Sequence, residues 1–223
     1  MKKTILFVTG TDTGVGKTVL TAWLARHLRE SGRAAIALKP VCSGGREDAL
    51  ALRAAAGNAL ALDKINPWHF HAPLAPLLAA RREGRKPKLA QVLTYIRHVQ
   101  TTFPIVLVEG AGGLLSPLGE DFDSRDLLVA LRATPLVACP NRLGAINQSL
   151  VTLAALPPAL SRQAKLVLMS PLREGSTSRS NDQYLREKLG PGRVHSVPWS
   201  ARPDQPERRV RAAITSLANA LGV

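Results

Sequence analysis

The chain has 223 residues, of which 45% are hydrophobic and 21% are charged, and this balance excludes a disordered protein. It predicts a single domain over residues 1–223, with one sizeable core. Cys42 and Cys139 lie far apart in the sequence, which excludes a disulfide framework or a cysteine-rich metal site. The net charge is +14, but the arginines are scattered and aromatic residues make up only 4%, which argues against nucleic acid as a partner. A basic surface that attracts anionic substrates is the simpler interpretation.

Short apolar runs alternate with helical segments along the chain. Strands are predicted at residues 5–8, 34–38, 105–108, 136–139 and 165–169, with a short one before Pro198. Helices are predicted from residue 19, at 47–56, 77–82 and 89–101, from Ser124, and at 145–156, 183–189 and 207–221. Residues 65–76, which carry three prolines, and the polar residues 175–181 are predicted to be loops.

This alternation predicts an α/β fold of three layers, with a mostly parallel central sheet and helices on both faces. In such folds, ligands bind at the carboxyl ends of the strands. No segment is apolar over the length needed to span a bilayer, and the first apolar run is too short for a signal peptide. We therefore expect a cytoplasmic protein with no membrane partner.

The most informative segment is residues 9–18, TGTDTGVGKT, which joins a predicted strand to a predicted helix. A glycine-rich turn before a helix binds phosphate, because its backbone N–H groups and the helix N-terminus favour an anion. Lys17 can reach the β- and γ-phosphates, and the Thr18 hydroxyl can ligate Mg²⁺. The P-loop pattern places its first glycine at Thr11, whereas this chain has Gly10. A glycine-rich turn with a chance lysine is the alternative. A dinucleotide-binding fingerprint is a second, weaker alternative, because the third glycine of that pattern is missing and residue 19 is valine.

Two further polar clusters follow predicted strands. Glu109 directly follows an apolar run and precedes the glycine-rich residues 110–113, where a P-loop protein places a carboxylate near Mg²⁺. Lys39 follows the second strand, with Ser43 close behind it and Asp48 near the start of the next helix. The alternatives are solvated charges at the strand ends for Glu109 and Lys39, and a helix-dipole partner for Asp48.

Taken in order, these segments resemble dethiobiotin synthetases. The resemblance rests on residues 10–18, KPVCSG at 39–44, DALAL at 48–52, Asn66-Pro67, EGAGG at 109–113, LGAIN at 143–147 and Pro198-Trp199. It spans residues 9–199. Partitioning-type ATPases share the fold but carry a lysine two residues after the first glycine, where this chain has Asp12.

The resemblance implies an ATP-dependent cyclo-ligase of biotin biosynthesis that takes 7,8-diaminononanoate, CO₂ and ATP, with Mg²⁺ as cofactor. In the implied reaction, an amine is carbamated, the carbamate attacks the γ-phosphate, and the second amine closes the ureido ring. A regulatory P-loop ATPase acting on a partner or nucleic acid is the alternative, and an inactive paralogue is another.

The same resemblance implies roles for individual residues. Lys17 and Lys39 would be the catalytic charges, and Thr18, Asp48 and Glu109 would hold Mg²⁺. The nucleotide would contact Thr13, Gly14, Val15, Gly16, Lys17, Thr18, Ser170, Pro198 and Trp199. The substrate would contact Thr11, Ser43, Gly110, Gly112 and Gly113, together with Leu143, Gly144 and Asn147 from the partner subunit of a homodimer. The alternative for residues 143–147 is simply the cap of the helix that follows.

One departure from the family pattern concerns the base. The family usually has an asparagine where this chain has Ser170, and a hydroxyl cannot make the paired donor and acceptor contact of an amide. We therefore expect weaker discrimination between ATP and other nucleoside triphosphates. A competition assay with GTP and CTP checks this, and strict preference for ATP would contradict it.

Overall fold

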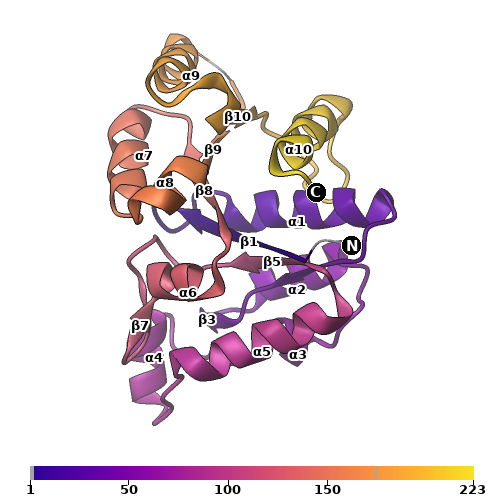
Figure 1. The fold of residues 1–223 in the computed structure, drawn as a ribbon, viewed down its shortest axis with the longest axis vertical. Coiled ribbons are helices and arrows are strands. Elements are labelled where there is room, and N and C mark those ends of the chain that lie inside the picture. Colours follow the sequence, from indigo (N-terminus) through magenta and orange to yellow (C-terminus); the bar gives the residue numbers. More distant parts are fainter. Residues whose placement is uncertain (1–2, 174) are drawn as a thin grey trace.

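The computed structural model describes residues 3–173 and 175–223, and its centre is a six-stranded parallel sheet (Figure 1). The strand order is β10-β9-β8-β1-β5-β2. These strands are β1 (Thr4–Gly10), β2 (Ala35–Leu38), β5 (Ile105–Glu109), β8 (Thr134–Pro140), β9 (Lys165–Met169) and β10 (Val194–Val197). They are almost continuously buried, which is why they read as uninterrupted apolar runs. The predicted strands are confirmed, including the short one before Pro198.

Helices cover both faces of this sheet, so the predicted three-layer fold is confirmed (Figure 1). One face carries α1 (Lys17–Glu30), flanked by α2 (Glu47–Ala55) and α10 (Arg208–Leu221). The other carries α5 (Leu89–Thr102), α6 (Ser124–Leu131), α7 (Ala145–Ala154) and α8 (Pro158–Gln163), while α9 (Ser176–Leu189) packs on β10 and α7. Among the described residues, none of these helices combines the length and apolar character needed to cross a bilayer.

Smaller elements lie around the sheet. The strand β3 (Val41–Ser43) pairs in parallel with β4 (Trp68–Phe70), and β6 (Pro117–Gly119) pairs antiparallel with β7 (Phe122–Asp123). The remaining short elements are α3 (Leu62–Ile65), α4 (Pro76–Arg82) and the 3₁₀ turn Pro191–Arg193.

Two loop predictions were wrong. Residues 65–76 contain the end of α3 and the strand β4, whose Phe70 is fully buried. Pairing with β3 stabilises this short strand, and such pairing is invisible in local composition. Residues 175–181 are also not a loop, because α9 begins at Ser176. Its first turns face the core with Ser178 and Asn181, so the helix lacks the apolar periodicity that the prediction relied on.

Strand register brings the three polar clusters to one edge of the sheet. β5 lies between β1 and β2, with Val8 opposite Glu109 and Leu38 opposite Val108. The phosphate loop follows β1, Lys39 follows β2, and Glu109 is the last residue of β5. All three clusters therefore meet at the carboxyl end of adjacent parallel strands.

The core of this sheet sets the stability of the site. Leu107 is completely buried in the middle of β5, so Leu107→Ala should lower the free energy of unfolding by about 2–5 kcal/mol. Leu50→Ala is the control, because Leu50 is 48% exposed, and it should cost less than about 1 kcal/mol. Urea unfolding measures both, and equal losses for the two variants would contradict this account of the core.

Candidate active site

The phosphate loop takes its shape from three glycines. Gly14 and Gly16 have positive φ angles of 72° and 94°, and Gly16 is the N-cap of α1. A Cβ at Gly10 would lie 2.4 Å from Cγ2 of Val15. The close approach that requires a glycine therefore falls at Gly10, which explains why the chain departs from the usual pattern at Thr11.

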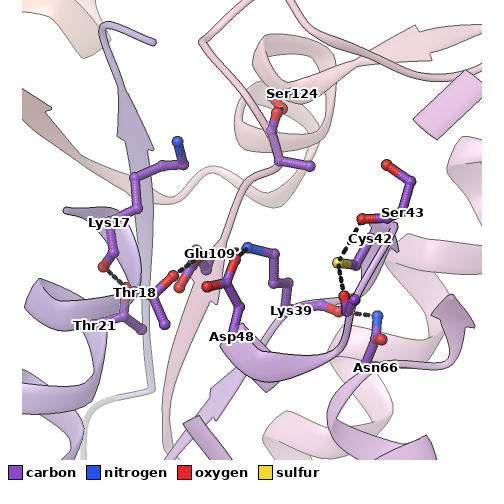
Figure 2. Close-up of polar contacts among 12 residues, drawn as sticks. Lys17, Thr18, Thr21, Lys39, Cys42, Ser43, Asp48, Asn66, Glu109 and Ser124 are labelled. Atoms are coloured by element: carbon purple, nitrogen blue, oxygen red, sulfur yellow. Dashed lines mark hydrogen bonds and ion pairs between the residues drawn. The ribbon is translucent and has the colours of Figure 1, made fainter. Parts of the chain in front are cut away.

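The first buried cation of the site is Lys17, in the first turn of α1. Its Nζ donates a 2.8 Å hydrogen bond to the carbonyl oxygen of Asp12 within the loop. Burial lowers the pKa of Lys17, and the negative charge of Glu109 only partly opposes this effect. Figure 2 shows the Lys17 ammonium on one side of Glu109 and Lys39 on the other.

The second cation, Lys39, is held between two carboxylates (Figure 2). Its Nζ donates a 2.6 Å hydrogen bond to Oε1 of Glu109 and another to Oδ2 of Asp48. Burial alone would lower the pKa of Lys39, but the charges of Glu109 and Asp48 outweigh burial and raise it. Lys39 is only 4% exposed, so it is a permanent buried ammonium rather than the solvated strand-end charge of the alternative interpretation.

The backbone of Lys39 is fixed as firmly as its side chain. Its N–H donates to the carbonyl oxygen of Ile65 at 3.0 Å, and Nδ2 of Asn66 donates to its carbonyl oxygen at 2.8 Å. The Asn66 side chain is buried. Asn66, the first residue of the Asn66-Pro67 pair found in the sequence, thus holds the backbone of Lys39 in place.

Thr18, Asp48 and Glu109, the three predicted metal ligands, come together around Lys39. The Thr18 hydroxyl donates to Oε1 of Glu109 at 2.8 Å, while Oε2 of Glu109 is buried with no hydrogen-bond partner among the described residues. Partial burial acts to raise the pKa of Asp48, but the Lys39 ammonium prevails and lowers it.

This donor set fits Mg²⁺. The described residues contain no group of three His, Cys, Asp or Glu side chains able to enclose a metal, so the protein offers two carboxylates and a hydroxyl. Mg²⁺ is bound in this way, through one or two carboxylates, with phosphate and water completing its shell.

A cavity of about 660 Å³ opens onto this cluster. Its lining includes half of the predicted site residues: Thr13, Gly14, Gly16, Lys17, Thr18, Lys39, Ser43, Asp48, Glu109 and Gly112. It also includes residues that the sequence did not single out: Cys42, residues 73–76, Ala111 and Ser116. Ser116 orders the glycine-rich segment, because its Oγ accepts a 2.9 Å hydrogen bond from the Gly113 N–H.

Thr11 and Gly110 were also predicted to contact the substrate, but they are not among the described residues that line this cavity. The Thr11 N–H donates to the carbonyl oxygen of Ala138, and the Thr11 hydroxyl is buried without a partner in the described chain. The Gly110 N–H donates to the carbonyl oxygen of Val8. Ser43, which does line the cavity, donates from Oγ to the carbonyl oxygen of Leu74 at 2.5 Å.

A second cavity, of about 400 Å³, lies on the other side of the phosphate loop. Val15, Ser170, Pro198 and Trp199 line it, and it shares Gly14 and Gly16 with the first cavity. The phosphate loop therefore lies between two cavities.

Two polar side chains in the lining of the second cavity are Ser170 and Asn141. The Ser170 hydroxyl is buried and has no partner in the part of the chain that the structure describes. The nearby Asn141 is already committed, because its Nδ2 donates to the Ser178 carbonyl and its Oδ1 accepts from Asn181. Asn141 was not predicted as a site residue, because it belongs to no motif that can be recognised in the sequence.

Leu143, Gly144 and Asn147 lie apart from both cavities, at the start of α7. Gly144 is the N-cap of this helix, with a φ of 91°. Leu143 is 85% exposed, and Gly144 and Asn147 are exposed as well. These residues form part of the outer surface rather than of a site within this chain.

Two curated proteins of related sequence share one name. The chain is 38% identical over 225 residues to the ATP-dependent dethiobiotin synthetase BioD of Anaeromyxobacter sp. strain K, covering 97% of this chain and 96% of the relative. It is 34% identical over 212 residues to the protein of that name from Xanthomonas oryzae pv. oryzae, covering 92% and 94%.

The remaining comparisons concern the domain and its fold. A family model described as an AAA domain matches residues 4–207. Among solved structures, the MinD cell division protein of Aquifex aeolicus has a TM-score of 0.62 at 12% identity, covering 99% of this chain and 98% of that one. A ParA family ATPase from Chlorobium tepidum has a TM-score of 0.61 at 14% identity, covering 99% and 100%. These likenesses show a shared P-loop fold, and the sequence relatives show the family. The chain belongs to the ATP-dependent dethiobiotin synthetases.

Proposed function

We propose that this chain converts 7,8-diaminononanoate, CO₂ and ATP to dethiobiotin, ADP and phosphate. The observation that carries the proposal is the pair of buried ammonium groups, Lys17 and Lys39, that face one cavity beside a phosphate loop. A carboxylated amine and a triphosphate are both anions. Two unit charges 4 Å apart repel by about 4 kcal/mol at an effective dielectric constant near 20, so cations are needed to bring the two together.

The reaction proceeds in three steps. One amine of the diamine attacks CO₂ and loses a proton, giving a carbamate. A carbamate oxygen then attacks the γ-phosphorus, the bond to the β,γ-bridging oxygen breaks, and ADP leaves. The second amine attacks the carbonyl carbon of the resulting mixed anhydride and loses a proton. The bond between that carbon and the oxygen that carries the phosphoryl group breaks, and phosphate leaves as the ring closes.

The protein contributes charge and position rather than covalent chemistry. Lys17 and the N–H groups of residues 13–18 hold the phosphates, and Lys39 faces the transferring group from the other side. Ser43 and Gly112, which line the same cavity, lie where the carbamated diamine would be held. The second cavity accepts the base between the loop and Trp199.

Thr18, Asp48 and Glu109 would hold Mg²⁺, which when bound neutralises charge on the phosphates. Their oxygens suit that ion, and the unpartnered Oε2 of Glu109, within the described chain, provides a buried acceptor for it.

We also propose that the chain works as a homodimer. Leu143 (85% exposed) and Val151 (61% exposed) place apolar surface on and beside α7. By family resemblance, Leu143, Gly144 and Asn147 would reach the diamine site of the partner subunit.

The proposed reaction is tested by incubating the protein with the diamine, bicarbonate and MgATP. Mass spectrometry should detect dethiobiotin, and ADP release should depend on both the diamine and bicarbonate. ATP hydrolysis that is indifferent to the diamine and stimulated by DNA would instead favour a regulatory ATPase.

The role of Lys39 gives a second prediction. Lys39→Ala should lower kcat by about 10²–10³-fold, because it removes a charge that acts on the transferring group. The dissociation constant for ATP should change only severalfold. Lys17→Ala is the comparison, because Lys17 holds the phosphates themselves and its loss should weaken ATP binding as well. Steady-state kinetics and nucleotide titration separate the two effects, and normal turnover by Lys39→Ala would refute the assignment.

The dimer gives a third prediction. Leu143→Glu places a charge on the proposed contact and should shift the protein from dimer to monomer in analytical ultracentrifugation, with loss of activity. Leu50→Glu is the matched control, because Leu50 is exposed on α2, on the opposite face of the sheet from α7. A monomeric wild-type protein with full activity would contradict the composite site.

A further inference from the structure

Lys39 occupies the centre of the proposed metal site. Its Nζ bonds to both carboxylates, Asp48 and Glu109, that are assigned to the metal (Figure 2). Oε1 of Glu109 accepts from Nζ at 2.6 Å and from the third assigned ligand, Thr18, at 2.8 Å. Two of the three groups expected to bind a divalent cation thus already bind an ammonium.

An ammonium and a metal ion cannot share these oxygens. The Lys39 and Glu109 side chains are 5% and 0% exposed, so no water shell separates the charges. A divalent cation bound to either oxygen of the Glu109 carboxylate would lie close to Nζ, which is bonded to Oε1, and like charges repel strongly in such a buried position. One of the two must leave.

The surroundings allow such an exchange. The Asp48 side chain is 47% exposed and can follow an incoming ion, while Oε2 of Glu109 is buried without a partner in the described part of the chain. Lys17 is bonded elsewhere, to the carbonyl oxygen of Asp12, and leaves the carboxylates to Lys39.

We propose that Lys39 is the resident counter-ion of the metal site in the free protein, and that a divalent cation enters only when a bound phosphate draws Lys39 away. The proposal rests on the assignment of Thr18, Asp48 and Glu109 as metal ligands. Metal binding and the arrival of Lys39 at the phosphate then become one event. Without nucleotide, the site excludes the metal.

The proposal makes a prediction for metal binding without nucleotide. With Mn²⁺ as the probe and electron paramagnetic resonance as the readout, the wild-type protein should bind weakly. Lys39→Met should bind Mn²⁺ at least about tenfold more tightly, because it leaves a buried carboxylate without its partner cation.

Lys17→Met is the matched control, since it removes one buried ammonium from the same cavity without touching the carboxylates. It should tighten Mn²⁺ binding by less than about threefold, through the loss of longer-range repulsion only. Equal tightening of Mn²⁺ binding by both variants would overturn the proposal. Tight Mn²⁺ binding by the wild-type protein in the absence of nucleotide would also overturn it.

Stability gives an independent readout. In EDTA, Lys39→Met and Lys39→Gln should melt roughly 5–10 °C below the wild type, because each leaves Glu109 charged and unpaired. Mn²⁺ should restore most of this loss in both Lys39 variants and none in Lys17→Met. Melting temperatures that Mn²⁺ leaves unchanged in the Lys39 variants would contradict the exchange.

If neither Lys39 variant folds, a crystal structure of the wild-type protein tests the proposal instead. Crystals grown with Mg²⁺ and a non-hydrolysable ATP analogue should show Nζ of Lys39 out of hydrogen-bond reach of Glu109 and turned towards the terminal phosphate. Nζ still bonded to both carboxylates, with the metal bound elsewhere, would overturn the proposal. None of these measurements needs the diamine, so failure of the exchange and failure of the proposed reaction are distinguished.

Discussion

The ion pair between Lys39 and Glu109 is the interaction on which the site depends. A carboxylate that is 1% exposed costs several kcal/mol to bury unless a cation neutralises it. Lys39 provides that cation at the end of the neighbouring strand, 2.6 Å away. Because the pair is neutral overall, the chain can keep two strong charges inside a cavity. The free protein thus holds the Lys39 ammonium in a position that is already desolvated.

The fold supplies the remaining geometry. Three adjacent strands, β1, β5 and β2, end at one edge, so the phosphate loop, Glu109 and Lys39 meet although they are far apart in the sequence. The phosphate loop lies between two cavities, and Gly10 permits its close contact with Val15. In the proposed function, a nucleotide would lie across the loop, with its base on one side and its reacting phosphorus on the other. Nothing in this arrangement requires a protein nucleophile.

Much of the fold and of the candidate site was predictable from the sequence. The features that were not predicted depend on partners that lie far away in the sequence. Apolar runs predicted the buried strands, and the clusters at their ends predicted Lys17, Lys39 and Glu109 as site residues. The pairing of Lys39 with Glu109 was not predictable, because it depends on β2 and β5 being neighbours. The amide of Asn141 and the strand β4 were missed for the same reason, since each is defined by a partner distant in sequence. Thr11 fitted the family pattern, yet its hydroxyl faces inward, because the loop backbone bonds to β8.

In the proposed mechanism, the site places a carboxylated amine against the terminal phosphate so that one attacks the other. The most direct test uses bicarbonate labelled with ¹⁸O, together with the diamine and MgATP, and follows the phosphate released at short times. If a carbamate oxygen attacks the γ-phosphorus, one labelled oxygen must appear in inorganic phosphate. Unlabelled phosphate, formed at the same rate as ADP, would show that water attacks instead and would contradict the account.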